Sequence, residues 1–155
     1  MNKIKLIGIG GGGSNIVKYL INSYPHIYKS LLIDDNEISF EDKICEIKNF
    51  VFRDENIYIV CSLGGEFGTT FLNQLIKEFR NYSEKLNFIL TTPFTFQGKT
   101  KLKKTNELLD NIKRHYLNVY IYPNNDFEGL EKDLQIVDFF NAQNEKFHQK
   151  INYKG

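Results

Sequence analysis

The sequence predicts a three-layer, Rossmann-like α/β domain in which a parallel sheet is covered by helices on both faces. Two observations predict it: apolar runs alternate with amphipathic stretches along the chain, and glycine-rich segments follow two of these runs. This order favours strands joined by crossover helices. With 155 residues, of which 41% are hydrophobic, we expect one core and one domain over residues 1–155.

Five apolar runs predict the strands of this sheet. They are residues 3–9 (KIKLIGI), 30–35 (SLLIDD), 56–62 (NIYIVCS), 87–92 (NFILTT) and 117–122 (LNVYIY). The second run ends in acid, and the third is apolar enough to be buried. The fourth is followed by Pro93, and the residue before a proline favours extended geometry.

Four stretches carry apolar residues at helical spacing. They are residues 14–23, about 70–82, about 99–115 and about 133–151. Ser14 is well suited to cap the start of the first helix. We find no repeat, low-complexity linker or internal domain boundary.

Charge and composition exclude several classes of function. A formal net charge of +1 gives no reason to expect nucleic acid or an anionic membrane as partner. No apolar run approaches the roughly 18 to 20 residues of a membrane span, so we expect no membrane insertion. Cys45 and Cys61 have no metal-type spacing, and without a signal peptide they indicate a cytoplasmic protein in which both act as small apolar residues.

The first glycine-rich segment, LIGIGGGGSN, begins at Leu6 and follows the first strand. Gly8, Gly10 and Gly13 match the spacing G-x-G-x-x-G, and Asp34 lies where an acid could hold a ribose in a dinucleotide site. Four consecutive glycines are also compatible with a turn around mononucleotide phosphates, because backbone without Cβ atoms can approach an anion closely. Tight packing of strand and helix remains a third interpretation.

A second glycine turn, SLGGEFGTT at residues 62–70, favours the mononucleotide interpretation. A dinucleotide fold needs one such turn, whereas two turns at the ends of neighbouring strands can enclose a triphosphate from both sides. No G-K-[ST] follows, so this is not a Walker P-loop. Backbone amides, a helix end and a metal ion, with Mg²⁺ as the candidate, would have to neutralise the phosphates.

Four segments in this order resemble the FtsZ/tubulin superfamily: KLIGIGGGGSN, SLGGEFGTT, TTPFTFQGKTK and YPNND, followed by a helix containing FFNAQNEKF. The resemblance covers essentially the whole chain but only the first half of the family's architecture. It implies the family's nucleotide-binding domain, with GTP or GDP as ligand. The residues that match the family's two phosphate turns are Gly10, Gly11, Gly12, Gly13, Gly64, Gly65, Gly68 and Thr69.

Other positions match the family's contacts to ribose and base. Asn15 is similar to the asparagine that reaches the guanine side, and Asn124 matches a further nucleotide-contacting asparagine. Gln97 stands where FtsZ usually has a ribose-binding glutamate, and Lys101 where it usually has an arginine.

Phe140 resembles the aromatic residue that stacks on the base, and Asn144 stands in the position that reads guanine. The two residues lie four apart, on one helix face, so a ring and an amide could meet a purine together. By periodicity alone, the favoured interpretation is that Phe140 is a core residue and Asn144 a solvated one, and only the resemblance reverses this preference.

The departures from the family pattern concern the phosphates. Glu66 replaces a signature glycine and Phe67 a signature threonine, and a carboxylate near a phosphate repels it. The segment NEISFEDKICEIKNFVFRDEN contains no glycine, although the family senses the terminal phosphate with a glycine-containing loop there. The family's second domain, which carries the acidic loop for hydrolysis, has no counterpart in these residues.

We therefore expect a truncated, divergent FtsZ-like protein that binds a guanine nucleotide without hydrolysing it alone, or a nucleotide-free interaction module. No catalytic residue or metal ligand is assigned. A helix strip including Phe139, Phe147 and Ile151 would serve self-association, and the nucleotide face would cap filaments of full-length FtsZ. The alternative is an NAD-type Rossmann protein, although no hydride-transfer site can be identified in the sequence.

Overall fold

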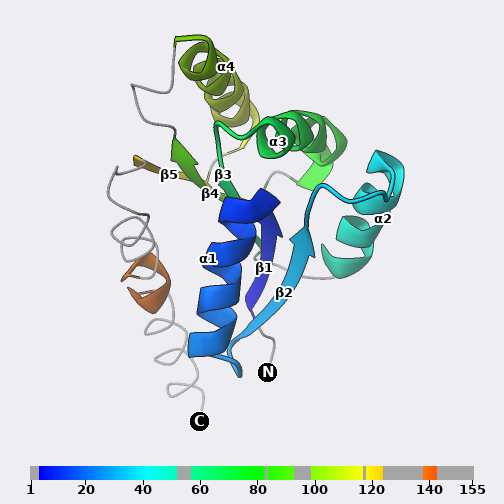
Figure 1. The fold of residues 1–155 in the computed structure, drawn as a ribbon. Coiled ribbons are helices and arrows are strands. Elements are labelled where there is room, and N and C mark those ends of the chain that lie inside the picture. Colours follow the sequence, from blue (N-terminus) through cyan, green and yellow to red (C-terminus); the bar gives the residue numbers. More distant parts are fainter. Residues whose placement is uncertain are drawn as a thin grey trace.

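The computed structural model describes residues 4–51, 57–82, 84–92, 99–116, 118–123 and 138–142. Its centre is a five-stranded sheet with the strand order β2-β1-β3-β4-β5, and every pairing in it is parallel (Figure 1). The strands are β1 (Ile4–Ile9), β2 (Tyr28–Ile33), β3 (Ile57–Ser62), β4 (Leu86–Thr92) and β5 (Asn118–Pro123). The predicted fold class is confirmed.

Four α-helices connect the strands. They are α1 (Gly10–Ser23), α2 (Phe40–Val51), α3 (Glu66–Glu78) and α4 (Lys99–His115). A 3₁₀ turn, η1 (Arg80–Tyr82), follows α3, and residues 138–142 are helical. No helix in the described ranges is both long enough and apolar enough to cross a bilayer.

The sheet is buried on both faces because successive side chains along its strands point alternately into two apolar clusters. Along β3, Tyr58 and Val60 face one cluster, while Ile57, Ile59 and Cys61 face the other. The first cluster contains residues from α1 and the 138–142 segment, and the second contains residues from α2, α3 and α4. Near-continuous apolar runs are what a parallel sheet covered on both faces requires.

Helix α2 was not among the predicted helices, although its sequence carries a helical signal. The Ser39 Oγ atom accepts a hydrogen bond of 3.2 Å from the Asp42 N–H, which caps the helix start. Ile44, Ile47 and Val51 then lie in the core at helical spacing. A serine followed three residues later by an acid and then by periodic apolar residues is a recognisable start signal.

The starts of α1 and α3 also differ from expectation. α1 begins at Gly10 directly after β1, so the four glycines form its first turn and Ser14 lies inside the helix. Ser14 does not cap the helix, because the N-cap residue is Ile9. Among the described residues, no side chain caps the first turn and the buried Ser14 hydroxyl has no hydrogen-bond partner. α3 begins at Glu66, four residues before the expected start. The four glycines of the first segment therefore form the N-terminal turn of α1, and the second segment leads through a short turn at Gly64 and Gly65 directly into α3.

Candidate functional site

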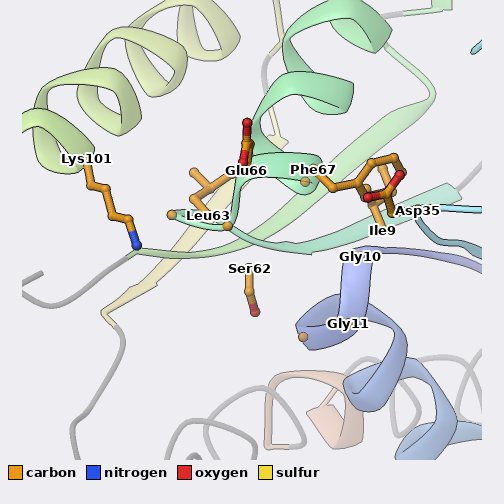
Figure 2. A pocket seen from close by; sticks show the side chains of 13 residues that line it. Ile9, Gly10, Gly11, Asp35, Ser62, Leu63, Glu66, Phe67 and Lys101 are labelled. Atoms are coloured by element: carbon orange, nitrogen blue, oxygen red, sulfur yellow. The ribbon is translucent and has the colours of Figure 1, made fainter.

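The two glycine segments meet at the point where the sheet reverses its winding direction. From β1 the chain crosses to β2 on one side, whereas from β3 it crosses to β4 on the other. In open parallel sheets the carboxyl ends of the strands at such a point border a crevice that commonly binds ligands. Here a pocket of about 480 Å³ lies at these ends, lined by residues 9–12 and 62–68 together with Asp35 and Lys101 (Figure 2).

Two helix N-termini contribute to the wall of this pocket. The first turn of α1 provides Gly10, Gly11 and Gly12, and that of α3 provides Glu66, Phe67 and Gly68. Neither N-terminus has a side-chain cap: the N-cap residues are Ile9 and Gly65. Uncapped N–H groups and the positive end of the helix dipole favour an anion. The arrangement therefore suits a ligand with more than one anionic group.

Three of the glycines are needed for close packing between helix and strand. A Cβ atom on Gly12 would lie 2.3 Å from the Ser62 Oγ atom, and one on Gly13 would lie 2.2 Å from the Val60 carbonyl oxygen. A Cβ atom on Gly68 would lie 3.1 Å from the Cys61 Sγ atom. These glycines bring both helices against β3, so the packing interpretation accounts for them without a ligand.

Other glycines leave space that a ligand can use. A Cβ atom added to Gly11 or Gly65 would have no heavy-atom neighbour within 4 Å, and both residues line the pocket. Gly10 and Gly64 have φ values of 74° and 103°, in the region that favours glycine. The backbone at these turns is therefore open to close approach, as phosphate binding requires.

The hydroxyl groups near the second turn have distinct surroundings. The Thr69 Oγ1 atom accepts a hydrogen bond of 3.2 Å from the Gly64 N–H, which fixes the turn. Thr69 lines a neighbouring cavity of about 360 Å³ rather than the main pocket. The buried Ser62 Oγ atom, in the main pocket, has no hydrogen-bond partner among the described residues.

Three charged side chains line the pocket: Asp35, Glu66 and Lys101. All three are exposed to solvent. In Figure 2 the Glu66 carboxylate points away from Gly10 and Gly11, and Lys101 extends from α4. Within the described part of the chain, no group of three or more His, Cys, Asp or Glu side chains is arranged to hold a metal ion.

The structure brings most of the expected phosphate-turn residues together. Lys101 lies in the pocket wall with six of the glycines, Gly10, Gly11, Gly12, Gly64, Gly65 and Gly68. Gly13 is buried behind this wall, and Asn15 is exposed on α1 outside the pocket lining. Gln97, Asn124 and Asn144 lie outside the described residues, as do Phe147 and Ile151.

The structure gives Phe140 a core position instead of an open face for a base. Its side chain is 0% exposed. The ring packs edge-on against Tyr28 at 5.8 Å and Tyr58 at 5.4 Å between centroids. Phe139 is half-buried and lies 4.7 Å from the Tyr120 ring, so both phenylalanines cover the α1 side of the sheet.

Sequence reasoning missed Asp35, Ser62 and Leu63 as pocket residues. A signal for Asp35 was present, because it follows the second strand and the carboxyl ends of parallel strands meet at one edge of the sheet. Leu63 is held there by its N–H, which donates a 2.8 Å hydrogen bond to the Thr91 carbonyl oxygen.

The two cysteines differ in their surroundings. Cys61 is fully buried, as expected of a small apolar residue, and burial raises the pKa of its thiol to about 12. The thiol therefore stays protonated and is a poor nucleophile. Cys45 is exposed on α2, so the expectation of a buried apolar role does not hold for it.

The sequence of this chain is similar to those of known cell division proteins. No family model matches the chain. The chain is 24% identical to the cell division protein FtsZ of Buchnera aphidicola, with 91% of this chain and 45% of that protein aligned. It is 27% identical to FtsZ of Aquifex aeolicus, with 89% and 47% aligned. The chain thus spans about half the length of these relatives.

Solved structures have the same fold. The FtsZ dimer of M. jannaschii matches with a TM-score of 0.69 and 20% identity, over 90% of this chain and 52% of that one. TubZ of the Clostridium botulinum phage c-st matches with a TM-score of 0.71 and 17% identity, over 91% and 58%. GDP-bound CetZ1 of Haloferax volcanii matches with a TM-score of 0.70 and 15% identity, over 88% and 58%. Together with the sequence relatives, these likenesses identify the chain as a divergent FtsZ/tubulin-like domain, similar to the N-terminal half of FtsZ.

Proposed function

We propose that this domain binds a guanine nucleotide in the crevice between β1 and β3, with the phosphates on the N-termini of α1 and α3. One observation carries the proposal: both glycine segments line a single pocket of about 480 Å³, and each contributes an uncapped helix N-terminus to it. A dinucleotide turn would use only the first of these.

The open positions within the two segments support phosphate as the group that is bound. Gly11 and Gly65 have no neighbour where a Cβ atom would lie, so a phosphate can approach the backbone at both turns. The Ser62 hydroxyl in the same wall, which has no hydrogen-bond partner among the described residues, is a further proposed donor. Lys101 is the lysine that lines the pocket, and it would meet the negative charge.

Guanine is the base we propose, because the structural relative CetZ1 is described as GDP-bound and the sequence resembles FtsZ in its base-contacting segments. Asn15, Gln97, Asn124 and Asn144 are the proposed contacts to ribose and base. Phe140 is not among them, because its ring is enclosed by Tyr28 and Tyr58.

Mg²⁺ fits this site as an ion shared with the nucleotide rather than as an ion held by the protein alone. Mg²⁺ is usually bound by one or two carboxylates together with phosphate oxygens and waters. Asp35, a carboxylate in the pocket wall, is the side chain that we propose as the protein ligand of this ion. When bound, the ion would neutralise the phosphates in a crevice that has few cationic side chains.

We further propose that these 155 residues do not hydrolyse GTP efficiently by themselves. In the family that the sequence resembles, the acidic loop for hydrolysis belongs to the second domain of the next subunit, and no segment of this chain resembles that loop. Association with a second copy, or capping of a full-length FtsZ filament, follows as the proposed mode of action. The dimer formed by the M. jannaschii relative supports this proposal.

Calorimetric titration with GTP, GDP, ATP and NAD, each with and without Mg²⁺, tests the ligand. We expect GTP or GDP to bind more tightly than ATP or NAD. Preference for NAD would refute the assignment. Phosphate release combined with sedimentation, with and without full-length FtsZ, tests the mode of action, and rapid hydrolysis by a strict monomer would contradict it.

A nucleotide-free interaction module is the second candidate, and Glu66 favours it. Its carboxylate stands in the wall of the pocket, at a position where the family has glycine. Absence of binding to every nucleotide, together with retained association with FtsZ or with itself, would support this second function.

A further inference from the structure

Lys43 on α2 occupies an unusual position behind the pocket. Its side chain is only 6% exposed, although lysine is almost never buried without a partner. Its ammonium lies over the Phe67 ring, with Nζ 4.8 Å from the ring centroid. Within the described residues this ammonium forms no ion pair with a carboxylate.

Phe67 connects this buried cation to the pocket. Its ring packs in a tilted arrangement on Phe71, with 5.6 Å between centroids, and Phe71 in turn packs on Phe40 at 5.4 Å. Phe67 also lines the pocket, and a Cβ atom added to Gly10 would lie 3.9 Å from the Phe67 Cδ1 atom. The ring therefore lies beside the first residue of α1, although Phe67 itself belongs to the first turn of α3. Phe67 thus contacts the Lys43 ammonium and also lines the pocket at which the two helix N-termini meet.

We propose that Lys43 binds the terminal phosphate of the ligand, and that its ammonium rests on the Phe67 ring when no ligand is bound. The inference rests on the proposed function, because it requires an anion at the two N-termini. A cation–π contact offsets only part of the hydration that a lysine ammonium loses on burial. A phosphate at the meeting point of the helices supplies the missing negative charge, and the flexible lysine stem can reach it when the Phe67 ring rotates.

This role accounts for two departures from the family pattern together. Phe67 stands where the family has a threonine, and the segment that contains α2 lacks the glycine loop that senses the terminal phosphate. In this chain, the same segment supplies a lysine next to Phe67. A charged side chain thereby replaces backbone amides as the sensor, and GTP is distinguished from GDP by the charge of its last phosphate.

The test compares Lys43→Met with Lys48→Met, a matched control on the same helix whose lysine is exposed. Calorimetry should show that Lys43→Met weakens GTP binding about tenfold, as expected for a lost charged hydrogen bond, and weakens GDP binding less. Lys48→Met should bind both as the unmodified protein does. Equal GTP affinity of Lys43→Met and Lys48→Met would overturn the inference and leave the proposed function intact.

Two further measurements separate the other outcomes. Thermal unfolding of each variant shows whether Lys43→Met is folded, and Lys43→Gln replaces it if it is not. The second measurement is the thermal stabilisation of the protein by pyrophosphate. If the protein binds pyrophosphate but no nucleotide, the assignment of guanine fails. The role of Lys43 is then tested by comparing the pyrophosphate affinities of Lys43→Met and Lys48→Met. Absence of binding to GTP and pyrophosphate alike would refute both proposals.

Discussion

Gly11 and Gly13 are two residues apart in the first turn of α1, and the structure gives them opposite roles. A Cβ atom on Gly13 would lie 2.2 Å from the Val60 carbonyl oxygen, 3.0 Å from its carbonyl carbon and 3.2 Å from the Cys61 Cα atom. All three are backbone atoms of the central strand β3. A Cβ atom on Gly11 would have no neighbour within 4 Å. Alanine substitutions at these positions therefore separate packing from ligand binding.

Gly13→Ala should destabilise the fold. To move from 2.2 Å to the 3.4 Å of an ordinary contact, α1 must retreat from β3 by about 1.2 Å. Overpacking of this kind costs about 1–3 kcal/mol or more, and the clash with fixed backbone places Gly13→Ala at the upper end. At roughly 2–4 °C per kcal/mol for a chain of this length, we expect the Tm to fall by about 6–12 °C.

Gly11→Ala should leave the fold intact and impair the site. Alanine in a helix is more favourable than glycine by up to about 1 kcal/mol, so the Tm should hold or rise slightly. The new methyl group would enter the space proposed for phosphate, and GDP affinity should fall about tenfold or more, as expected for loss of charged hydrogen bonds. Thermal denaturation of both variants measures the change in Tm, and calorimetric titration measures the change in GDP affinity. Unchanged stability of Gly13→Ala would refute the close packing of α1 on β3, and unchanged GDP affinity of Gly11→Ala would exclude phosphate from this turn.

Three further predictions follow from individual side chains. Glu66→Gln should raise GTP affinity several-fold in calorimetry, because it removes a repulsive charge. The free energy of unfolding should fall by about 0.3–1 kcal/mol, because an acid in the first turn of a helix is favourable. Weaker GTP binding would contradict the repulsion and would indicate that Glu66 acts through a metal ion. Burial raises the pKa of Cys61 and of Tyr116 to about 12 each, so both groups lose protons first in the unfolded state. Stability should therefore fall by up to about 1.4 kcal/mol per pH unit for each group, above about pH 9 for Cys61 and above about pH 10 for Tyr116. A flat denaturation profile to pH 11 would contradict this. Ser39→Ala should cost about 0.5–2 kcal/mol in denaturant unfolding through loss of the α2 cap, and a null effect would mean that the cap hydrogen bond does not form in solution.

The strands could be predicted closely because a single physical constraint determines them. A parallel strand covered on both faces has to be apolar at nearly every position, and the third and fourth runs match β3 and β4 to within one residue at either end. α4 has the expected bounds because its apolar spacing is uninterrupted. α2 carries a weaker signal, because its 12 residues include many charged side chains and place only Ile44, Ile47 and Val51 among the buried apolar residues.

The site was harder to predict because the positions of the glycines in the sequence do not reveal what each glycine faces in the fold. The first segment contains Gly12 and Gly13, which face β3, and Gly11, which faces open space. A sequence motif treats them alike, since only the distance between helix and strand separates the two roles. Phe140 presented the same difficulty: aromatic spacing on a helix fits a base or a core equally, and the rings of Tyr28 and Tyr58 decide in favour of the core.

The departures at Glu66 and Phe67 alter the charge around the crevice without closing it. In Figure 2 the Glu66 carboxylate is directed away from the start of α1, and the side chain is exposed to solvent. Phe67 is half-buried and packs on Phe71, where its ring also faces the Lys43 ammonium. The turn lacks the threonine hydroxyl, and the Lys43 ammonium lies on the Phe67 ring beside the proposed phosphate site. We therefore expect this divergent turn to bind phosphate, because a charged side chain can neutralise the anion where backbone and hydroxyl donors are fewer.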